Sequence, residues 1–395
     1  MQFANHNQKW AILALVVITN MLTTAIPTMA ISVLSQEIAQ DLRLDLVQVG
    51  VIWGAGALLG IPTAFLGGAI GDRIGPRKVL AVGTLVAGLL GLARGFATDF
   101  FSLSVLNIAM GGVAPVVLMN GIKTAGMWFP RKQLGLANGI NSMGMALGFM
   151  IGSLVSATLL SPMLGGWRNV LIAYGVLAAL CSIAWFFAPN PPGQPTKNTS
   201  SILRALAHVA SLRNIWLLGL AITGISGAIQ GTLGYLPLYL RNAGWPPLQA
   251  DGALSAFHTV SMFFVMPVVA LSDRLGSRKG PALVATLLMS LGIGGMAFAT
   301  GASVWVAVIV AGCVRDAFMA IYMTMIIETE GVGPAYAGTA TGFNIALAGV
   351  GNLLAPPLGN SLASIHPGAP FWLWSALALA GFTSLLFFRD ARPAA

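Results

Sequence analysis

The chain has 395 residues, of which 56% are hydrophobic and only 8% are charged, and its mean hydropathy is +0.83. Soluble domains carry about 25% charged residues, so this composition excludes both a water-soluble globule and a disordered chain. A net charge of +9 would suggest a nucleic-acid partner in a soluble protein. In so apolar a chain we interpret it as basic loops on one side of a bilayer, and we predict no nucleic-acid partner.

A membrane-spanning helix needs about 20 mainly apolar residues. The sequence holds twelve runs of this kind, separated by charged, proline, glycine or asparagine residues. In chain order they cover residues 10–34, 46–70, 79–97, 99–122, 133–159, 168–188, 214–240, 248–271, 280–299, 303–327, 336–364 and 369–389. Barrel strands would alternate over about 10 residues, whereas these runs are continuously apolar. We therefore predict an all-α membrane protein with twelve transmembrane helices.

The longest connection between spans, residues 189–213, differs in composition from the rest of the chain. It is rich in proline and contains a polar stretch over 197–201. Such a composition is typical of a linker. It separates a predicted six-helix bundle over residues 1–188 from a second six-helix bundle over residues 214–395.

The lysines and arginines are distributed unevenly between the connections. If the N-terminus is cytoplasmic, 15 of the 20 lie on the cytoplasmic side, four lie outside and one, Arg315, lies within a span. The four outer residues are Arg43, Arg94, Arg168 and Arg241. Because loops rich in lysine and arginine stay in the cytoplasm, we predict that both termini are cytoplasmic. We assign the chain to the cell inner membrane as a multi-pass protein surrounded by the lipid bilayer.

Two segments carry the same loop motif. Residues 68–78 read Gly-Ala-Ile-Gly-Asp-Arg-Ile-Gly-Pro-Arg-Lys, and residues 269–279 read Val-Ala-Leu-Ser-Asp-Arg-Leu-Gly-Ser-Arg-Lys, at a shift of 201. A weaker repeat relates spans five and eleven at a shift of 203. Its positions are Gly135, Ala137, Gly139, Asn141 and Gly148, which recur as Gly338, Ala340, Gly342, Asn344 and Gly351. Duplicated six-helix halves are a transporter architecture with a substrate site near the midplane.

The pattern Gly-x3-Asp-Arg-x-Gly-x-Arg-Lys between spans two and three resembles the signature loop of the major facilitator superfamily. The similarity extends over essentially the whole chain, in span count, loop lengths, central linker and repeat. The resemblance implies alternating access between the two bundles, with spans one, four, seven and ten lining a central cavity. The sequence departs from the pattern where Val269 replaces the leading glycine, so we expect the second loop to be held less tightly.

The resemblance also implies a gate formed by the loop motifs. The residues concerned are Asp72, Arg73, Gly75, Arg77, Asp273 and Arg274. Asp72 and Arg73 would latch the two halves together on the cytoplasmic side in one state and release them in the other. Gly75 allows a tight turn. Arg77 either belongs to this gate or only follows the rule that cytoplasmic loops are basic.

Span ten contains the charged pair Arg315–Asp316 near the bilayer midplane. Charges at this depth are costly and usually functional. An arginine fork matches a carboxylate or a similar planar anion, so we predict that Arg315 binds an anionic substrate and that Asp316 couples protons. Neighbouring helical residues diverge by about 100°, so we expect the two side chains to face different points. The alternative is that the pair is structural and satisfies itself or its neighbours.

Other polar side chains at mid-span extend the candidate substrate site. They are Tyr322, on the same face as Arg315, and Asn20, Thr23, Asn107, Gln230 and His258. Each either contacts the substrate or bonds a neighbouring helix. Asn141 and Asn344 lie nearer the cytoplasmic ends, where we expect packing or gating.

His258, Met262 and Met266 follow one another at intervals of four residues along span eight. Imidazole and thioether ligands suit copper, and the stripe resembles that of a bacterial copper importer of the same superfamily. However, span seven has no Met-x3-Met, and methionine in an apolar helix usually serves packing. We therefore predict no metal site and keep copper import as an alternative.

The primary hypothesis is a secondary active transporter of a small organic anion, driven by a proton gradient and without a cofactor. A first alternative is efflux of drugs or metabolites by proton antiport. Such exporters share an arginine in span four, where this chain has Asn107. A second is a non-transporting receptor or assembly factor built on the same fold, which would predict a lost central cavity or extra domains. The sequence lacks a phosphate loop, a nucleophile elbow and a metalloprotease motif, so we predict that the chain is not an enzyme. The sequence also gives no sign of an obligate protein partner.

Overall fold

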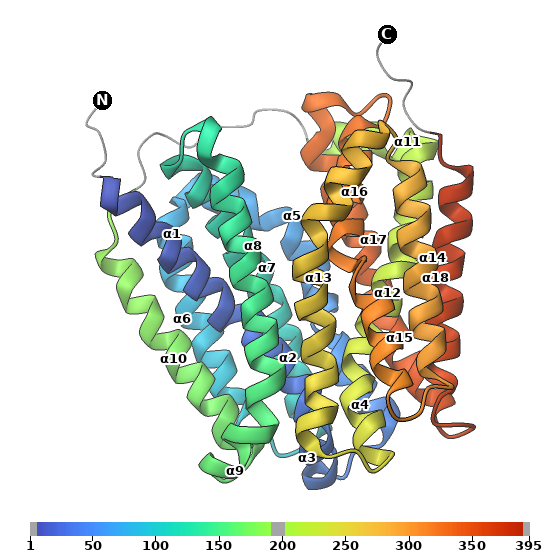
Figure 1. The fold of residues 1–395 in the computed structure, drawn as a ribbon. Coiled ribbons are helices and arrows are strands. Elements are labelled where there is room, and N and C mark those ends of the chain that lie inside the picture. The colour runs from blue at the N-terminus through green and yellow to red at the C-terminus, as the bar shows by residue number, and fades with distance from the viewer. Residues whose placement is uncertain (1–5, 191–201, 390–395) are drawn as a thin grey trace. The chain divides into compact units, whose positions relative to one another are not determined.

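The structure, a computed structural model, describes residues 6–190 and 202–389. Every regular element in this part of the chain is a helix, which confirms the all-α prediction (Figure 1). Before the linker these are α1 (His6–Asn20), η1 (Met21–Ala25), α2 (Ile26–Val33), α3 (Ser35–Leu42), α4 (Leu46–Ala55), α5 (Ala57–Ile74), α6 (Pro76–Arg94), α7 (Phe100–Trp128), α8 (Arg131–Val155), η2 (Ser156–Leu160), α9 (Ser161–Leu164) and α10 (Trp167–Phe187). After it they are α11 (Ile202–Ser211), α12 (Arg213–Asn242), α13 (Pro247–Leu275), α14 (Lys279–Met296), α15 (Ser303–Gly312), α16 (Arg315–Glu328), α17 (Gly333–Leu362) and α18 (Ala369–Phe387).

Each predicted span coincides with one helix or with a short series of helices in these ranges. Eleven helical stretches of the described chain are long and apolar enough to cross a membrane. The predicted span outside this set is α17, which carries Asn344, Asn352 and Asn360 among its apolar residues. Its 30 residues still exceed the length of about 20 that crosses a hydrocarbon core.

Contacts divide the chain into two compact units. Unit 1 consists of Met1–Leu44 and Ala55–Asn198, and unit 2 consists of Asp45–Gly54 and Thr199–Ala395. This division differs from the predicted bundles in the place of α4. The helix precedes α5 in the second span, yet it belongs to unit 2.

Hydrogen bonds and close packing attach α4 to unit 2. The indole of Trp53 donates to the backbone oxygen of Gln230 at 2.6 Å, and Asn360 donates to the backbone oxygen of Leu46 at 2.8 Å. A Cβ at Gly54 would lie 2.8 Å from a backbone oxygen of α17, so only glycine permits this approach. These contacts join residues that are far apart in sequence, and the hydropathy of the span does not predict them.

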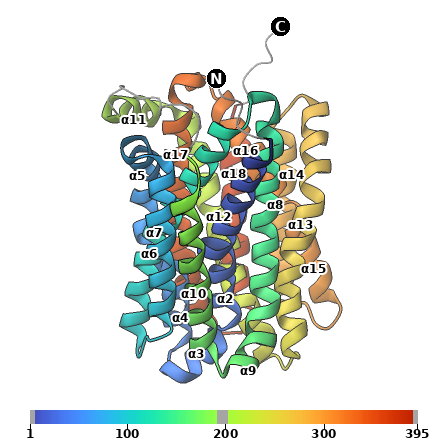
Figure 2. The same cartoon turned by 90° about the vertical axis from the view of Figure 1, so that its left-hand side faces the viewer.

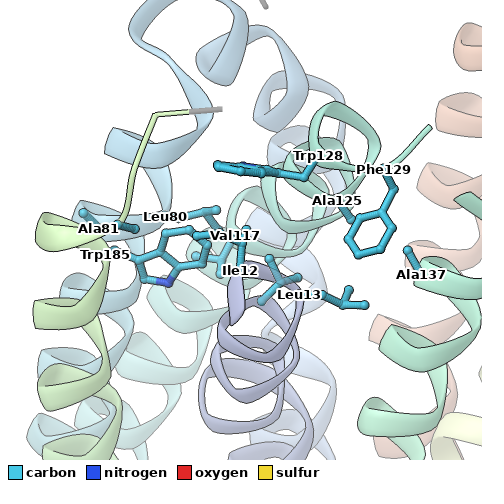
Figure 3. Close-up of a cluster of buried hydrophobic side chains, with 12 residues drawn as sticks. Ile12, Leu13, Leu80, Ala81, Val117, Ala125, Trp128, Phe129, Ala137 and Trp185 are labelled. Atoms are coloured by element: carbon cyan, nitrogen blue, oxygen red, sulfur yellow. The ribbon is translucent and has the colours of Figure 1, made fainter. Parts of the chain in front are cut away.

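Large apolar side chains gather at one end of unit 1. Figure 3 shows this cluster, in which α1, α6, α7, α8 and α10 or the residues that follow them meet. Its members are Ile12, Leu13, Val16, Leu80, Ala81, Val117, Ala125, Trp128, Phe129, Ala137, Trp185 and Ala188. The indole of Trp185 donates to Thr19 Oγ1 at 2.8 Å, so this buried polar group is satisfied. The cluster holds the first and sixth spans against α6, which begins within the first loop motif.

A short amphipathic helix, α11, occupies part of the predicted linker. It runs crosswise to α12 and α17 at one end of unit 2 (Figure 2). Ala205 and Val209 are buried, whereas Arg204 is exposed. Nε2 of His208 lies 2.8 Å from a backbone oxygen of the connection between α16 and α17. Composition alone indicated a linker here, and the remainder of the proline-rich stretch, residues 191–201, lies outside the described residues.

Equivalent glycines of the repeat have equivalent surroundings, each within its own unit. A Cβ at Gly148 would meet a side chain of span one at 2.6 Å, and a Cβ at Gly351 would overlap the backbone carbonyl of Thr223. Gly135 and Gly338, by contrast, face open space. One glycine in each copy therefore permits close helix approach.

Replacing Gly351 with alanine is expected to destabilise the protein, because the methyl group would push α12 and α17 apart. Overpacking of this kind costs about 1–3 kcal/mol, so the midpoint of thermal unfolding in detergent should fall. Gly338→Ala in the same helix is the matched control, since nothing lies within 4 Å of its added methyl. Equal melting temperatures for the two variants would contradict the packing role of Gly351.

Candidate functional site

Span ten is interrupted, and the interruption positions two charged side chains. Its first helix, α15, ends at Gly312, and α16 begins at Arg315 after a turn at Cys313 and Val314. Arg315 and Asp316 are therefore the first two residues of a helix. The first turn of a helix has backbone N–H groups without helical partners and carries the positive end of the helix dipole. A helix start inside a span favours negative charge.

Arg315 and Asp316 contact both each other and α13. Nη1 of Arg315 lies 3.0 Å from Nδ1 of His258 and 3.5 Å from Oδ1 of Asp316. The backbone N–H of Asp316 donates to Oγ of Ser261 at 3.0 Å. Since a guanidinium only donates, Nδ1 of His258 is the unprotonated ring nitrogen. The structure thus brings three predicted site residues, His258, Arg315 and Asp316, together in unit 2.

The expectation that Arg315 and Asp316 face different points is wrong. The argument from helical angles holds for short side chains, but the arginine side chain is long and folds back toward its neighbour. Both residues also start the helix, where the preceding turn does not confine them. As a result, any anion that reaches Arg315 competes with the carboxylate of Asp316.

Tyr322 is buried away from this cluster. Its hydroxyl lies 2.7 Å from Oδ1 of Asn344 and 3.2 Å from the backbone oxygen of Leu218. Its ring stacks on Phe318, with centroids 5.6 Å apart. The side chain thereby links α16 to α12 and α17, and Asn344 has a packing position in the same junction. The contacts do not bring Tyr322 to Arg315.

Asn20 and Thr23 lie where α1 passes into the π-helical turn η1 of unit 1. Nδ2 of Asn20 donates to Oδ1 of Asn141 at 2.9 Å, and the hydroxyl of Thr23 donates to the backbone oxygen of Thr19 at 2.8 Å. Both side chains are buried. Within the described chain Oδ1 of Asn20 has no hydrogen-bond partner. A π-helical turn with an unused acceptor is typical of a functional position.

Asn107 and Gln230 make different kinds of contact. Oδ1 of Asn107 accepts a hydrogen bond from Nη1 of Arg94 at 3.1 Å, and its Nδ2 donates to the backbone oxygen of Leu103 at 3.1 Å. Gln230 uses its backbone oxygen to hold Trp53, and its side chain is half-buried. Asn107 therefore orients an arginine from the neighbouring span.

Contacts inside unit 1 hold the first loop motif. Asp72 forms an ion pair with Lys123 of α7, while Arg73 is exposed. Nε of Arg77 donates to the backbone oxygen of Trp185 at 3.1 Å, in the last turn of α10. A cation at this place complements the negative end of the helix. Arg77 thus anchors the sixth span.

Both motif loops turn at a glycine with a positive φ, which is +90° at Gly75 and +62° at Gly276. Glycine adopts such angles without strain, as the tight turn in the prediction requires. In the second copy, Asp273 accepts a hydrogen bond from Nη1 of Arg278 at 2.5 Å, which raises the pKa of Arg278. Arg274 is exposed. The second loop is thus held by a hydrogen bond between two charged residues of its own motif.

The stripe of His258, Met262 and Met266 does not converge on one point. His258 is 1% exposed and contacts Arg315, whereas Met266 is 75% exposed on the outside of the helix. No group of histidine, cysteine, aspartate and glutamate side chains in the described ranges has the arrangement of a metal site. His258 and Met266 therefore lie in different surroundings in this structure.

Two buried arginines were assigned to outer loops by the sequence analysis. Arg94 ends α6 and is 3% exposed. Arg241, in the last turn of α12, donates from Nη2 to both carboxylate oxygens of Asp251, at 2.7 and 2.6 Å. The residues before them are apolar in either case, so the sequence does not tell a buried arginine at a span end from an exposed one.

Known proteins share this architecture. The family model of the Major Facilitator Superfamily matches residues 13–327 and again residues 244–395. A solved structure of a mutant of the nucleoside transporter NupG is similar with a TM-score of 0.82, over 96% of this chain and 100% of that chain. At 14% sequence identity this similarity concerns the fold alone.

Two curated relatives are similar over part of their length. The probable sulfoacetate transporter SauU of Cupriavidus necator is 25% identical over 276 residues, which cover 63% of this chain and 62% of that protein. The 3-(3-hydroxy-phenyl)propionate transporter of Escherichia coli is 27% identical over 245 residues, which cover 60% of this chain and 59% of that protein. These relatives are transporters and not enzymes. With its helical architecture and a family model that matches most of its length, this chain belongs to the Major Facilitator Superfamily.

Proposed function

We propose that the chain is a secondary active transporter of a small organic anion with a carboxylate-like group, and that Arg315 binds this anion. The observation that carries the proposal is the helix start inside span ten, where a guanidinium and the first turn of α16 lie together. Both attract negative charge, and the attraction is stronger in surroundings of low polarity. The guanidinium fork also selects planar anions over neutral solutes of the same size.

His258 orients the guanidinium of Arg315, and Asp316 controls whether that guanidinium is available to the substrate. His258 accepts from Nη1 and so fixes the direction of the guanidinium. Asp316 lies 3.5 Å from the same nitrogen and competes with a substrate anion. Protonation of Asp316 removes the competitor, so proton and anion bind together more readily than either binds alone. The site keeps the same net charge when empty and when occupied by both, and this favours symport.

The relatives support an anionic substrate. They are named for sulfoacetate and for 3-(3-hydroxy-phenyl)propionate, which are both carboxylates at neutral pH. Efflux of drugs by proton antiport stays a competing function, since the fold serves transport in either direction. The site of Arg315 favours the anion, because a guanidinium attracts an anion and repels a cationic drug.

The loop motifs are the proposed gate. We place them and both termini on the cytoplasmic side from the distribution of basic residues. Asp72 is paired with Lys123 here, so a latch requires it to exchange this partner. Arg77 contacts α10 here, and we propose that it anchors the loop.

Arg315→Ala is expected to lower uptake of the best carboxylate into proteoliposomes by about ten- to a hundredfold, because a charge-assisted contact is worth about 1.5–3 kcal/mol. Arg315→Lys keeps the positive charge but lacks the planar fork, so its uptake should lie between that of the wild type and that of Arg315→Ala. Arg204→Ala removes an exposed arginine of α11 and is the matched control, with unchanged uptake.

The substrate panel for this assay contains aliphatic and aromatic carboxylates, nitrate and a cationic dye. Unchanged uptake of the best substrate by Arg315→Ala would show that the anion is not bound there. Uptake of the dye with no uptake of any anion would favour efflux by antiport. Copper uptake that depends on His258 would revive the metal alternative.

Asp316→Asn is expected to abolish the response to a pH gradient while leaving exchange of anions intact, because an amide does not carry the proton. The measurement compares accumulation under an inward proton gradient with counterflow in its absence. The wild type should accumulate the anion only with the gradient. If Asp316→Asn still responds to the gradient, another group couples the proton.

Asp72→Asn is expected to slow uptake by about tenfold while substrate binding in detergent stays at the wild-type level, because a gate affects turnover and not the binding site. Binding is followed by the substrate-dependent rise of the melting temperature. Loss of both uptake and binding in a folded variant would argue for a structural role of Asp72 and Lys123 instead.

A further inference from the structure

Arg94 has no place in the transport mechanism proposed above. It lies at the end of α6, away from the loop that carries Asp72, and its side chain is 3% exposed. An ionised group buried without a counter-ion costs several kcal/mol. No acidic side chain forms an ion pair with Arg94 within residues 6–190 and 202–389. The C-terminal end of α6 offsets part of this cost through its dipole.

The polar contacts of Arg94 leave one edge of the guanidinium unused. Nη1 donates to Oδ1 of Asn107 at 3.1 Å, whereas Nε has no partner in the described chain. Nε and Nη2 form the edge that takes a carboxylate in the two-point geometry. The nearest acid in sequence, Asp99, is exposed and accepts from the backbone N–H of Ser102 at 2.8 Å. This bond lowers the pKa of Asp99 and commits its carboxylate to the start of α7.

A second unused donor lies next to Asn107. Ser104 precedes it by three residues on α7, so the two side chains are neighbours on the helix surface. Its Oγ is buried and has no hydrogen-bond partner in the part of the chain that the structure describes. Buried hydroxyl groups usually form a hydrogen bond. The hydroxyl of Ser104 and Nε of Arg94 are therefore both available to a ligand. The two donors come from different helices, and each lies near the same asparagine: Arg94 donates to it, and Ser104 lies one helical turn from it.

We propose that Arg94 and Ser104 form a binding site for a small anion in unit 1. The chemistry is that of a monovalent anion such as chloride or a single carboxylate group. Asn107 orients the guanidinium without neutralising it, whereas an aspartate at this position would fill the site with its own charge. The bound anion is then the counter-ion of Arg94, for which the described residues provide no acidic partner. The site is separate from that of Arg315, which belongs to unit 2.

The test is thermal unfolding of the full-length protein in detergent, in sodium gluconate exchanged at constant ionic strength for sodium bromide or sodium acetate. Gluconate serves as an anion too large for the buried position. The wild type is expected to gain about 3 °C or more with bromide, acetate or both, since a ligand of the folded state stabilises it. Gain with bromide alone assigns a halide site, and gain with acetate alone assigns a carboxylate site. No gain with either anion overturns the proposal.

Variants separate this site from the transport site. The part of the gain that is lost in Arg94→Gln should persist in Arg315→Gln, so the proposal and the proposed function fail independently. If Arg94→Gln does not fold, Ser104→Ala is the milder variant, and its apparent Kd for the anion should rise about fivefold through the loss of one hydrogen bond. In bromide-soaked crystals the anomalous peak is expected beside Nε of Arg94. A peak elsewhere, or an unchanged Kd in Ser104→Ala, would refute the site.

Discussion

The free-energy cost of placing a charge in hydrocarbon constrains this whole structure, because a buried charged side chain without a partner destabilises the fold. Lys+Arg and Asp+Glu number only 20 and 11 in 395 residues. Arg94, Arg241 and Arg315 nevertheless lie at or within the spans, and each has a different kind of partner. Arg241 has the buried carboxylate of Asp251, and Arg315 has Asp316 and His258. Among the described residues, Arg94 has only the neutral Asn107. Arg241 is the arginine with a full ion pair, whereas the two arginines proposed to bind anions have a partial or a neutral partner.

The backbone obeys the same constraint. A helix interrupted inside a membrane exposes polar groups, and it is tolerated only where neighbouring side chains satisfy them. The break in span ten meets this condition, since the backbone N–H of Asp316 donates to Ser261 on α13. The interruption and the charged pair therefore depend on each other. In the proposed function this helix start binds an anion, and Ser261 of the neighbouring helix offsets part of the cost of the break.

In the internal repeat, different residues of the two halves make the same kind of contact with the last span. In unit 1, Arg77 donates to the last turn of α10. In unit 2 the equivalent of Arg77 is Arg278, which binds Asp273 instead, and Lys279 donates to backbone oxygens at the end of α18 at 2.7 and 2.8 Å. Each motif thus anchors the last span of its own half with a cation. The physical requirement is a positive charge near carbonyl groups, which either neighbouring position of the motif supplies.

The sequence by itself determined the membrane-spanning all-α class, the approximate place of the spans, the duplicated loop motif and the candidate pair Arg315–Asp316. These follow from local physics, because the thickness of the bilayer sets the length of apolar runs and charge within them is rare. Only the tertiary structure decided that α4 packs with unit 2. It also decided that Arg94 points inward and that Tyr322 bonds Asn344. In a span that is apolar on all sides, rotation about the helix axis leaves hydropathy unchanged. Contacts with neighbouring helices, such as the close approach at Gly351, choose which side chains face one another.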